Sequence, residues 1–221
     1  MLLGSGYLKI IAQLVLFCAK KSCGFKKKYR NLQPKINSNQ SIYQNYMKHF
    51  VSYFNDSVKK HWDLPAVTNF GKETYTYGQM AESIAKYHIL FKETGIAKGD
   101  KVALFARNSA EWVIAYYATL TYGAVTVPFL PDFKSQAVVE LSLFSDCKML
   151  IADDYAINDL KGDAVNISKL DNDKNFIGIL NLKAFSVAHA SKEVLETVCS
   201  VIEDSYKSLY PNGITAHSID Y

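Results

Sequence analysis

The sequence predicts an α/β fold, in which a mostly parallel sheet is flanked by helices. The main observation lies in residues 99–128: a glycine-led turn feeds the apolar strand Lys101 to Ala106, a polar turn opens a long apolar helix, and a second strand follows Gly123 at once. Such a strand–helix–strand unit with short connections is typical of parallel strands. A third apolar strand, Cys147 to Ala152, continues the alternation of strands and helices beyond this unit.

A helix and a small hairpin are expected before this unit. Apolar residues at helical spacing predict an amphipathic helix over residues 42–60. A short strand over Pro65 to Asn69, a turn at Gly71-Lys72 and a partner strand over Glu73 to Tyr77 predict the hairpin.

Two long helices of the body have recognisable ends. Thr76 and Gln79 have the spacing of a capping box, which predicts a helix start there, and Gly95 after Thr94 is placed to end that helix in the left-handed conformation. The second helix, about residues 109–122, is apolar nearly all round, which predicts burial on most sides. Its tryptophan and tyrosines favour core packing, although such a stripe of rings also suggests a ligand-stacking surface.

The C-terminal part of the chain alternates less clearly. Ser135 is expected to cap a helix from Gln136 to about Phe144. Ala164 to Ile167 and Phe176 to Leu182 are expected as short strands between polar loops. A stripe of apolar residues predicts a final helix over residues 191–210.

Composition and cysteine use are those of an ordinary globular protein. Of the 221 residues, 49% are hydrophobic and 21% are charged. The cysteines are scattered and form no C-x-x-C pair, which favours free thiols in a reducing cytoplasm over disulfides or a metal site. They are Cys18, Cys23, Cys147 and Cys199.

Residues 1–40 form a basic tail with a charge of +8, because they contain eight lysines and arginines and no acidic residue. Within this tail, residues 8–19 are apolar apart from Lys9 and Gln13 but are too few to span a bilayer. Three interpretations stay open: a disordered or upstream segment before a start at Met47, a helix in the interface of an anionic membrane through residues 8–35, and a secretory signal. No aromatic platform accompanies the lysines, so no nucleic-acid partner is expected.

Three passages carry a resemblance to a known family. The hairpin with its threonine-tyrosine helix start, the run Gly99 to Pro128, and the strand that ends in Asp153-Asp154 resemble the N-terminal subdomain of AMP-forming acyl-CoA synthetases. This adenylate-forming family includes long-chain fatty acid–CoA ligases. The resemblance covers residues 42–153 well and residues 154–221 loosely. It implies an enzyme that activates a fatty acid with Mg-ATP to an acyl-adenylate, releases pyrophosphate and transfers the acyl group to coenzyme A.

The residues that would hold ATP are missing from residues 1–221. The family's phosphate loop has the form Thr-Ser-Gly-Thr-Thr-Gly, so that backbone N–H groups can approach the phosphates, and nothing in this sequence matches it. The family's ribose-binding acidic residue and C-terminal lysine are absent too. The best-matched run, Gly99 to Pro128, forms scaffold in the family. The resemblance therefore assigns no catalytic, cofactor-binding or metal residue here, and ATP, Mg and CoA are implied only for the full-length enzyme.

Other candidate groups have no catalytic spacing. The histidines share no motif and are expected at the surface or rim; they are His49, His61, His88, His189 and His217. The acidic pairs Asp153-Asp154 and Asp171-Asn172-Asp173 can hold a cation, but strand ends and turns use the same residues constantly.

The sequence thus predicts a basic tail over residues 1–40, disordered or an interfacial helix, and an incomplete N-terminal AMP-binding synthetase domain over residues 41–221. The expected function is that of the N-terminal portion of a long-chain acyl-CoA synthetase, inactive alone. Its expected partners are the missing C-terminal half, in the same or a separate chain, and a fatty acid in the complete enzyme. The alternative is a non-catalytic, membrane-associated or protein-binding α/β module. The expected location is the cytoplasm, including peripheral attachment at the inner face of the membrane.

Overall fold

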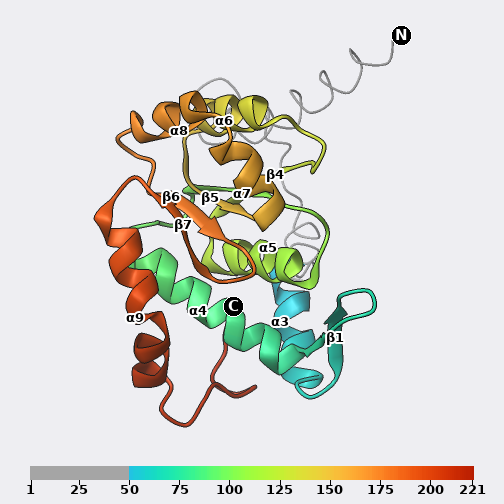
Figure 1. Cartoon of the computed structure of the whole chain (residues 1–221). Helices are drawn as coiled ribbons and strands as arrows, with labels where there is room; N and C mark the ends of the chain where they lie inside the picture. Colours follow the sequence, from blue (N-terminus) through green and yellow to red (C-terminus); the bar gives the residue numbers. More distant parts are fainter. Residues whose placement is uncertain (1–49) are drawn as a thin grey trace, which may run out of the picture. The chain divides into compact units, whose positions relative to one another are not determined.

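A computed structural model describes residues 50–221, which belong to the unit His49–Tyr221 (Figure 1). Its helices and strands follow one another as α3 (Phe50–Lys60), β1 (Pro65–Thr68), β2 (Thr74–Thr76), α4 (Tyr77–Glu93), β3 (Lys101–Phe105), α5 (Ala110–Tyr122), β4 (Val125–Phe129), α6 (Ser135–Phe144), β5 (Cys147–Ala152), α7 (Asp154–Lys161), α8 (Ala164–Asp171), β6 (Gly178–Asn181), β7 (Ser186–Ala190) and α9 (Glu193–Leu209). The helix predicted over residues 42–60 is confirmed as α3 from Phe50 onward, and residues 42–49 lie outside the described part.

The main sheet has the strand order β4-β3-β5-β6-β7. The pairs β3–β4, β3–β5 and β5–β6 are parallel, and only β7 runs antiparallel to its neighbour β6. This arrangement confirms the predicted α/β class with a mostly parallel sheet. Strand β4 lies at one edge and continues through Pro128, opposite Leu104 of β3. Strands β1 and β2 form a separate antiparallel hairpin.

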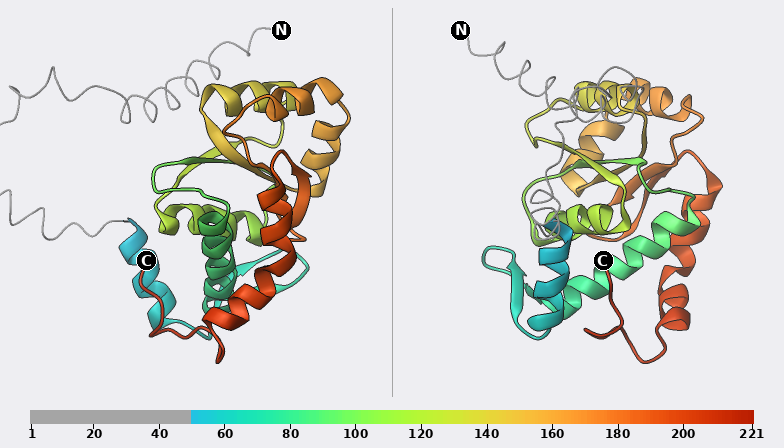
Figure 2. Two further views of the ribbon diagram at one scale, coloured as in Figure 1. Left: turned by 90° about the vertical axis from the view of Figure 1, so that its left-hand side faces the viewer. Right: turned by 180° about the vertical axis from the view of Figure 1, so that it is seen from behind.

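Helices cover both faces of the sheet, because the side chains of its central strands alternate between two cores. On β3, Val102 and Leu104 join the core under α4, α5 and α9, whereas Ala103 and Phe105 join the core under α6, α7 and α8. Figures 1 and 2 show α6 and α8 on one side of the sheet and α4 and α5 on the other. Strands buried on both faces are typical of parallel sheets.

The predicted ends of the two long helices are confirmed. Thr76 caps α4, accepting a hydrogen bond from the main-chain N–H of Gln79, while the Gln79 side chain accepts one from the N–H of Thr76. Ser109 caps α5 in the same way through the N–H of Trp112. Gly123 then ends α5 with φ of 86°, a left-handed conformation that glycine adopts without a steric penalty. None of the residues of α5 is exposed, as predicted for a helix that is apolar all round.

Four details of the C-terminal half differ from the prediction. Residues 164–167, expected as a strand, begin helix α8, because Asp163 accepts a hydrogen bond from the N–H of Val165 and so starts a helix. Asp153 likewise caps α7, which was not predicted. Strand β7 was not predicted either. Ser135 is the first residue of α6 rather than its cap, and the capping position is Lys134, which makes no side-chain hydrogen bond to the helix.

The chain returns to the N-terminal side of the unit after α9. Ile219 is buried, and the ring of Tyr221 stacks against Phe54 of α3 with 5.7 Å between the ring centroids. The main-chain N–H of Tyr221 donates to Asn55, and Asp220 pairs with Lys59 at 3.3 Å. These contacts attach residues 219–221 to α3. No helix between residues 50 and 221 has the length and hydrophobicity that a membrane crossing requires.

A polar network attaches the hairpin to the first turn of α5. The carboxylate of Glu111 accepts hydrogen bonds from the Asn69 amide at 3.1 Å and from the Tyr75 hydroxyl at 3.0 Å. The side-chain carbonyl oxygen of Asn69 in turn accepts a hydrogen bond from the main-chain N–H of Ala110 at 2.8 Å. Burial alone would raise the pKa of Glu111, but hydrogen bonds from its own main-chain N–H and from the side chains of Asn69, Tyr75 and Ser109 outweigh burial and hold its pKa below the ordinary value. Burial and the hydrogen bond to Glu111 raise the pKa of Tyr75 to about 12.

We expect Glu111→Gln to destabilise the protein by about 1 kcal/mol at neutral pH, because a neutral amide replaces a charged acceptor. Since the folded-state pKa of Glu111 lies below its ordinary value of 4.5, its contribution is present above pH 4.5 and is lost as the pH falls through the folded-state pKa. Urea unfolding of both proteins, at neutral pH and in acid, measures the difference. The exposed Glu196→Gln in the first turn of α9 is the control. A difference in unfolding free energy between wild type and Glu111→Gln that stays the same from neutral to acidic pH would contradict this account.

Gly178 stands where three elements meet, and it has no room for a side chain. A Cβ placed there would collide with the carbonyl oxygen of His189 on β7 and lie 2.6 Å from Cδ2 of Leu195 on α9. We expect Gly178→Ala to cost about 2–3 kcal/mol of unfolding free energy, because a backbone atom cannot move aside without breaking the β6–β7 pairing.

Gly162→Ala is the matched control for this substitution. Gly162 follows α7 with φ of −63°, and a Cβ there would find its nearest atoms at 3.4 Å. We expect its stability to stay within about 0.5 kcal/mol of wild type. Chemical denaturation of the three proteins compares them, and equal stabilities for both alanine variants would refute the packing described for Gly178.

Candidate functional site at the carboxyl edge of the sheet

The carboxyl ends of the parallel strands β3, β4, β5 and β6 lie along one edge of the sheet. The chain leaves β3 for β4 on one side and later enters β5 on the other side, so the strand order reverses between β3 and β5. Open parallel sheets bind ligands outside the carboxyl ends of their strands at such a reversal. The residues that follow β3 and β5 are therefore the first place to look for a site.

Arg107 and Asp153 meet at this reversal. Arg107 follows β3, and its Nε donates to Asp153 Oδ2 at 2.9 Å; its main-chain N–H donates to the same oxygen at 3.3 Å. The guanidinium also lies over the ring of Tyr155, 5.2 Å from the ring centroid. The side chain of Asp153 is only 4% exposed, whereas that of Arg107 is 57% exposed. The pair thus holds a largely exposed guanidinium at the edge of the sheet, a group of the kind that binds anions.

Asp153 is occupied in holding the structure together. Its second oxygen, Oδ1, accepts the main-chain N–H of Ala156 at 2.9 Å and caps α7. Burial alone would raise the pKa of Asp153, but the hydrogen bonds from Ala156 and Arg107 together lower it. A carboxylate held in its ionised form in this way positions Arg107 and is poorly suited to act as a general base.

The remaining acidic candidates also have structural partners. Asp154 accepts a hydrogen bond from the Asn181 amide at 2.6 Å, which joins the carboxyl ends of β5 and β6. Asp171 accepts from His189 Nε2 and from the Ser191 hydroxyl, each at 2.7 Å. Between residues 50 and 221 no three His, Cys, Asp or Glu side chains gather in a way that could hold a metal ion. The acidic pairs therefore stand at the ends of strands and helices, where they stabilise the fold.

The histidines of the described part have no shared site. His88, expected at the surface or rim, is partly buried between α4 and α5, where Nε2 lies 2.9 Å from Thr121 Oγ1 and 3.2 Å from the carbonyl oxygen of Ala118. Burial lowers the pKa of His88 to about 4, so the ring is neutral at pH 7. His49 lies outside the described residues.

The described residues do not fit ATP or its magnesium ion. Nucleotide phosphates are commonly held by a run of free main-chain N–H groups, for which left-handed glycines are a common source. Gly99 and Gly123 have such conformations, but they lie at the amino ends of β3 and β4, where the N–H of Gly99 is bonded to the carbonyl oxygen of Gly123 at 2.8 Å. The opposite edge carries Arg107 without a phosphate loop.

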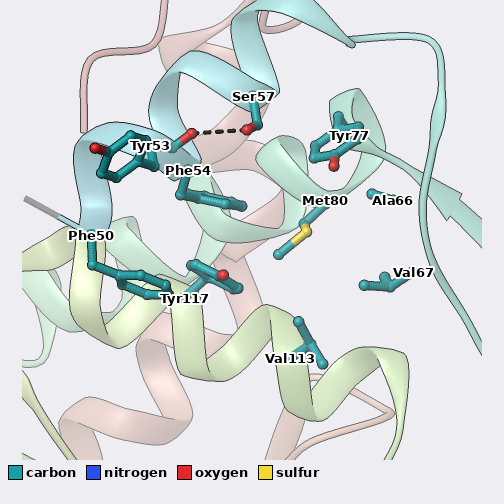
Figure 3. Close-up of a pocket in the computed structure, with 10 residues that line it drawn as sticks. All are labelled: Phe50, Tyr53, Phe54, Ser57, Ala66, Val67, Tyr77, Met80, Val113 and Tyr117. Carbon is teal, nitrogen blue, oxygen red and sulfur yellow. Dashed lines mark hydrogen bonds between the residues drawn. The ribbon is translucent and has the colours of Figure 1, made fainter. Parts of the chain in front are cut away.

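The aromatic stripe of α5 packs within the protein. Trp112 stacks on Tyr116 with 5.3 Å between ring centroids, and Tyr117 stacks on Phe54 of α3 at 4.0 Å. The stripe is partly buried and packs against the core, as favoured from the sequence. At its outer end, Tyr117 and Val113 form one wall of a groove of about 310 Å³ between α3, β1, α4 and α5 (Figure 3).

The sequence indicated which strands make this edge but not which residues meet there. The sequence places Arg107 in the polar turn before the apolar helix of residues 109–122, and Asp153 at an acidic strand end. They are 46 residues apart in the chain. The available signal was their shared position, directly after two parallel strands, which places both at one edge of the sheet.

Comparison with known proteins shows which family the chain resembles. The profile of the AMP-binding enzyme family matches residues 54–201. Surfactin synthase subunit 2 of Bacillus subtilis is 31% identical over 98 residues, which are 44% of this chain and 3% of that protein. The long-chain-fatty-acid–CoA ligase heimdall of Drosophila melanogaster is 27% identical over 109 residues, which are 46% of this chain and 16% of that protein.

A solved structure gives the same architecture. The R395G mutant of coronafacic acid ligase from Pectobacterium brasiliense superposes with a TM-score of 0.53 at 21% identity, covering 60% of this chain and 25% of that one. The present chain thus spans a small part of each of these proteins. Since the family profile covers well over half of its residues, the chain belongs to the AMP-binding enzyme family.

Proposed function

We propose that this chain is the N-terminal portion of an AMP-forming ligase that activates a long-chain fatty acid. The observation that carries the proposal is the family match over residues 54–201, which includes the whole parallel sheet. The fatty acid is suggested by the Drosophila relative, whose name specifies a long-chain fatty acid–CoA ligase. In such a reaction the carboxylate attacks the α-phosphate of ATP, pyrophosphate leaves, and the acyl group passes from AMP to coenzyme A.

This chain supplies scaffold for that reaction and not its catalytic groups. Adenylation needs donors aimed at the phosphates before the reaction begins. Residues 1–221 contain no Thr-Ser-Gly-Thr-Thr-Gly loop. We therefore propose that ATP, magnesium and coenzyme A are bound by the C-terminal half of the synthetase, on the same chain or on a separate one, and that the 221 residues are inactive alone.

A stand-alone module is the second candidate, and the basic charge of residues 1–40 is the observation that favours it. In this case the fold would serve as a protein-binding or membrane-associated unit with the basic tail as its anchor. The DNA beyond codon 221 distinguishes the two candidates, because a synthetase fragment should be followed there by a phosphate loop.

We expect no palmitate-dependent ATP–pyrophosphate exchange from the 221-residue chain above a heat-killed control. If a phosphate loop is encoded downstream in any frame, the protein that includes it should catalyse ATP–pyrophosphate exchange. We expect this exchange to be strong with palmitate as the acid substrate and weak with acetate or benzoate. Exchange by the short chain would refute its inactivity. Preference for acetate or benzoate would refute the long-chain substrate. Unrelated sequence in all three frames, together with a monodisperse and cooperatively folding short chain, would favour the module.

We further propose that residues 8–35 attach the protein to the inner, anionic face of a membrane. All eight positive charges of residues 1–40 are uncompensated within that segment, and about 1 kcal/mol is available for each basic residue near an anionic surface.

Removing residues 1–40 should abolish binding to phosphatidylserine vesicles while leaving the melting temperature unchanged. Vesicle co-sedimentation of both lengths measures the first effect, with neutral phosphatidylcholine vesicles and high salt as controls, because screening weakens electrostatic attachment. Equal binding of the two lengths would exclude the tail as the anchor, and a large loss of thermal stability would mean that the tail is part of the folded core.

A further inference from the structure

Residues 210–221 form a strap that leaves the end of α9 and crosses to α3 (Figure 2). The strap contains neither helix nor strand. A turn at residues 210–213 opens it, in which the N–H of Gly213 donates to the carbonyl oxygen of Tyr210 at 2.9 Å. Gly213 has φ of 77°, a left-handed conformation that favours glycine. The strap therefore changes direction at a defined point beside α9.

Two side chains fasten the far end of the strap to the body. Ile219 is 5% exposed and belongs to the core under α4, α5 and α9. The ring of Tyr221 lies between two helices, because it stacks on Phe54 of α3 with 5.7 Å between the ring centroids and meets the His88 ring of α4 edge to face at 5.8 Å. The strap thus ties α3 to α4.

The polar groups of this fastening are poorly matched. Among residues 50–221 the buried hydroxyl of Tyr221 has no hydrogen-bond partner. Water would bond to that hydroxyl once the ring is released, so its burial opposes the closed arrangement. Asp220, whose side chain is 91% exposed, pairs with Lys59, and the N–H of Tyr221 reaches Asn55 at 3.3 Å. Exposed ion pairs contribute little, so the two apolar contacts hold the strap.

Helix α3 is the element that depends on this fastening. Of its eleven residues only Phe54 and Val58 are buried. The ring of Phe54 is shared, since it stacks on Tyr117 of α5 at 4.0 Å as well as on Tyr221. Segments with few buried contacts open locally at a lower free energy than the whole protein does. Release of Tyr221 would therefore remove part of the packing that holds α3.

We propose that the strap is a releasable fastening of α3: residues 214–221 detach by turning about residues 210–213, and α3 loosens with them while the sheet stays folded. The unpartnered hydroxyl of Tyr221 keeps the closed strap less stable than a matched contact would make it. Opening uncovers the rings of Phe54 and His88. This device goes beyond the proposed ligase function and does not depend on it, so its test succeeds or fails separately.

Native-state hydrogen exchange of the full 221-residue chain, in increasing low concentrations of urea, measures this opening. We expect the amides of α3 to exchange at least about tenfold faster than the most protected amides of β3. Their exchange should also depend less on urea, because local opening exposes less surface than global unfolding.

Two substitutions at one position test the link between the strap and α3. Tyr221→Phe removes the unpartnered hydroxyl and keeps the ring, so α3 should exchange at least about fivefold more slowly. Tyr221→Ala removes both ring contacts, so α3 should exchange at least about tenfold faster. Tyr53→Phe is the matched control, since it removes a hydroxyl from a tyrosine of α3 that is 58% exposed, and exchange should stay within about twofold of wild type.

Exchange of α3 with the urea dependence of β3 would overturn the proposal, because the helix would then open only with the whole protein. So would α3 exchange that Tyr221→Ala leaves unchanged, or a Tyr221→Phe variant that exchanges as fast as wild type. An equal effect of Tyr53→Phe would assign the change to the helix and not to the strap, and would also overturn it. Circular dichroism melting verifies that each variant is folded.

Discussion

The burial of strand β3 on both of its faces sets the arrangement of the other elements. Its residues Val102 to Phe105 are each at most 2% exposed. Burying a valine, leucine or phenylalanine side chain is worth roughly 1.5–3 kcal/mol, and a strand with two apolar faces obtains this on both faces only if helices cover both. Because crossovers between parallel strands are right-handed, moving from β3 to β4 and then back across to β5 places α5 and α6 on opposite faces. The reversal that brings Arg107 beside Asp153 is a result of the same path.

The parts of the fold that the sequence predicted are those in which local signals agree with one another. The strand–helix–strand unit has apolar strands, the Ser109 cap and the left-handed Gly123, and all three belong to neighbouring residues. The errors fall where local signals conflict. Residues 164–167 have β-branched members that suggest a strand, but Asp163 before them caps a helix. Strand β7 has only five residues, none of them fully buried, and its position depends on pairing with β6 and on cover from α9.

The sequence predicts only that the candidate site lies at the carboxyl edge of the sheet, and not which residues form it. Its location follows from strand direction, which the sequence indicates, but its residues depend on distances between segments that lie far apart. Arg107 and Asp153 have unremarkable neighbours in the sequence, and only the β3–β5 register brings them together. Glu111, Asn69 and Tyr75 are a similar case, since the hairpin and α5 are joined by side chains from three separate segments. The partial burial of His88 could not be predicted, because nothing in its local sequence distinguishes a partly buried histidine from an exposed one.

Pro128 has a consequence for how this protein behaves in a crowded solution. A proline is tolerated within a sheet where its missing N–H faces away from the partner strand, and Pro128 lies in β4, at the edge of the sheet. The outer side of β4 therefore offers one hydrogen-bond donor fewer to any foreign strand. Edge strands with a complete set of donors are templates for β-aggregation, and a proline interrupts the ladder that would grow from them. The residue that limits β4 as a pairing partner thus also helps to keep an exposed sheet edge from seeding fibrils.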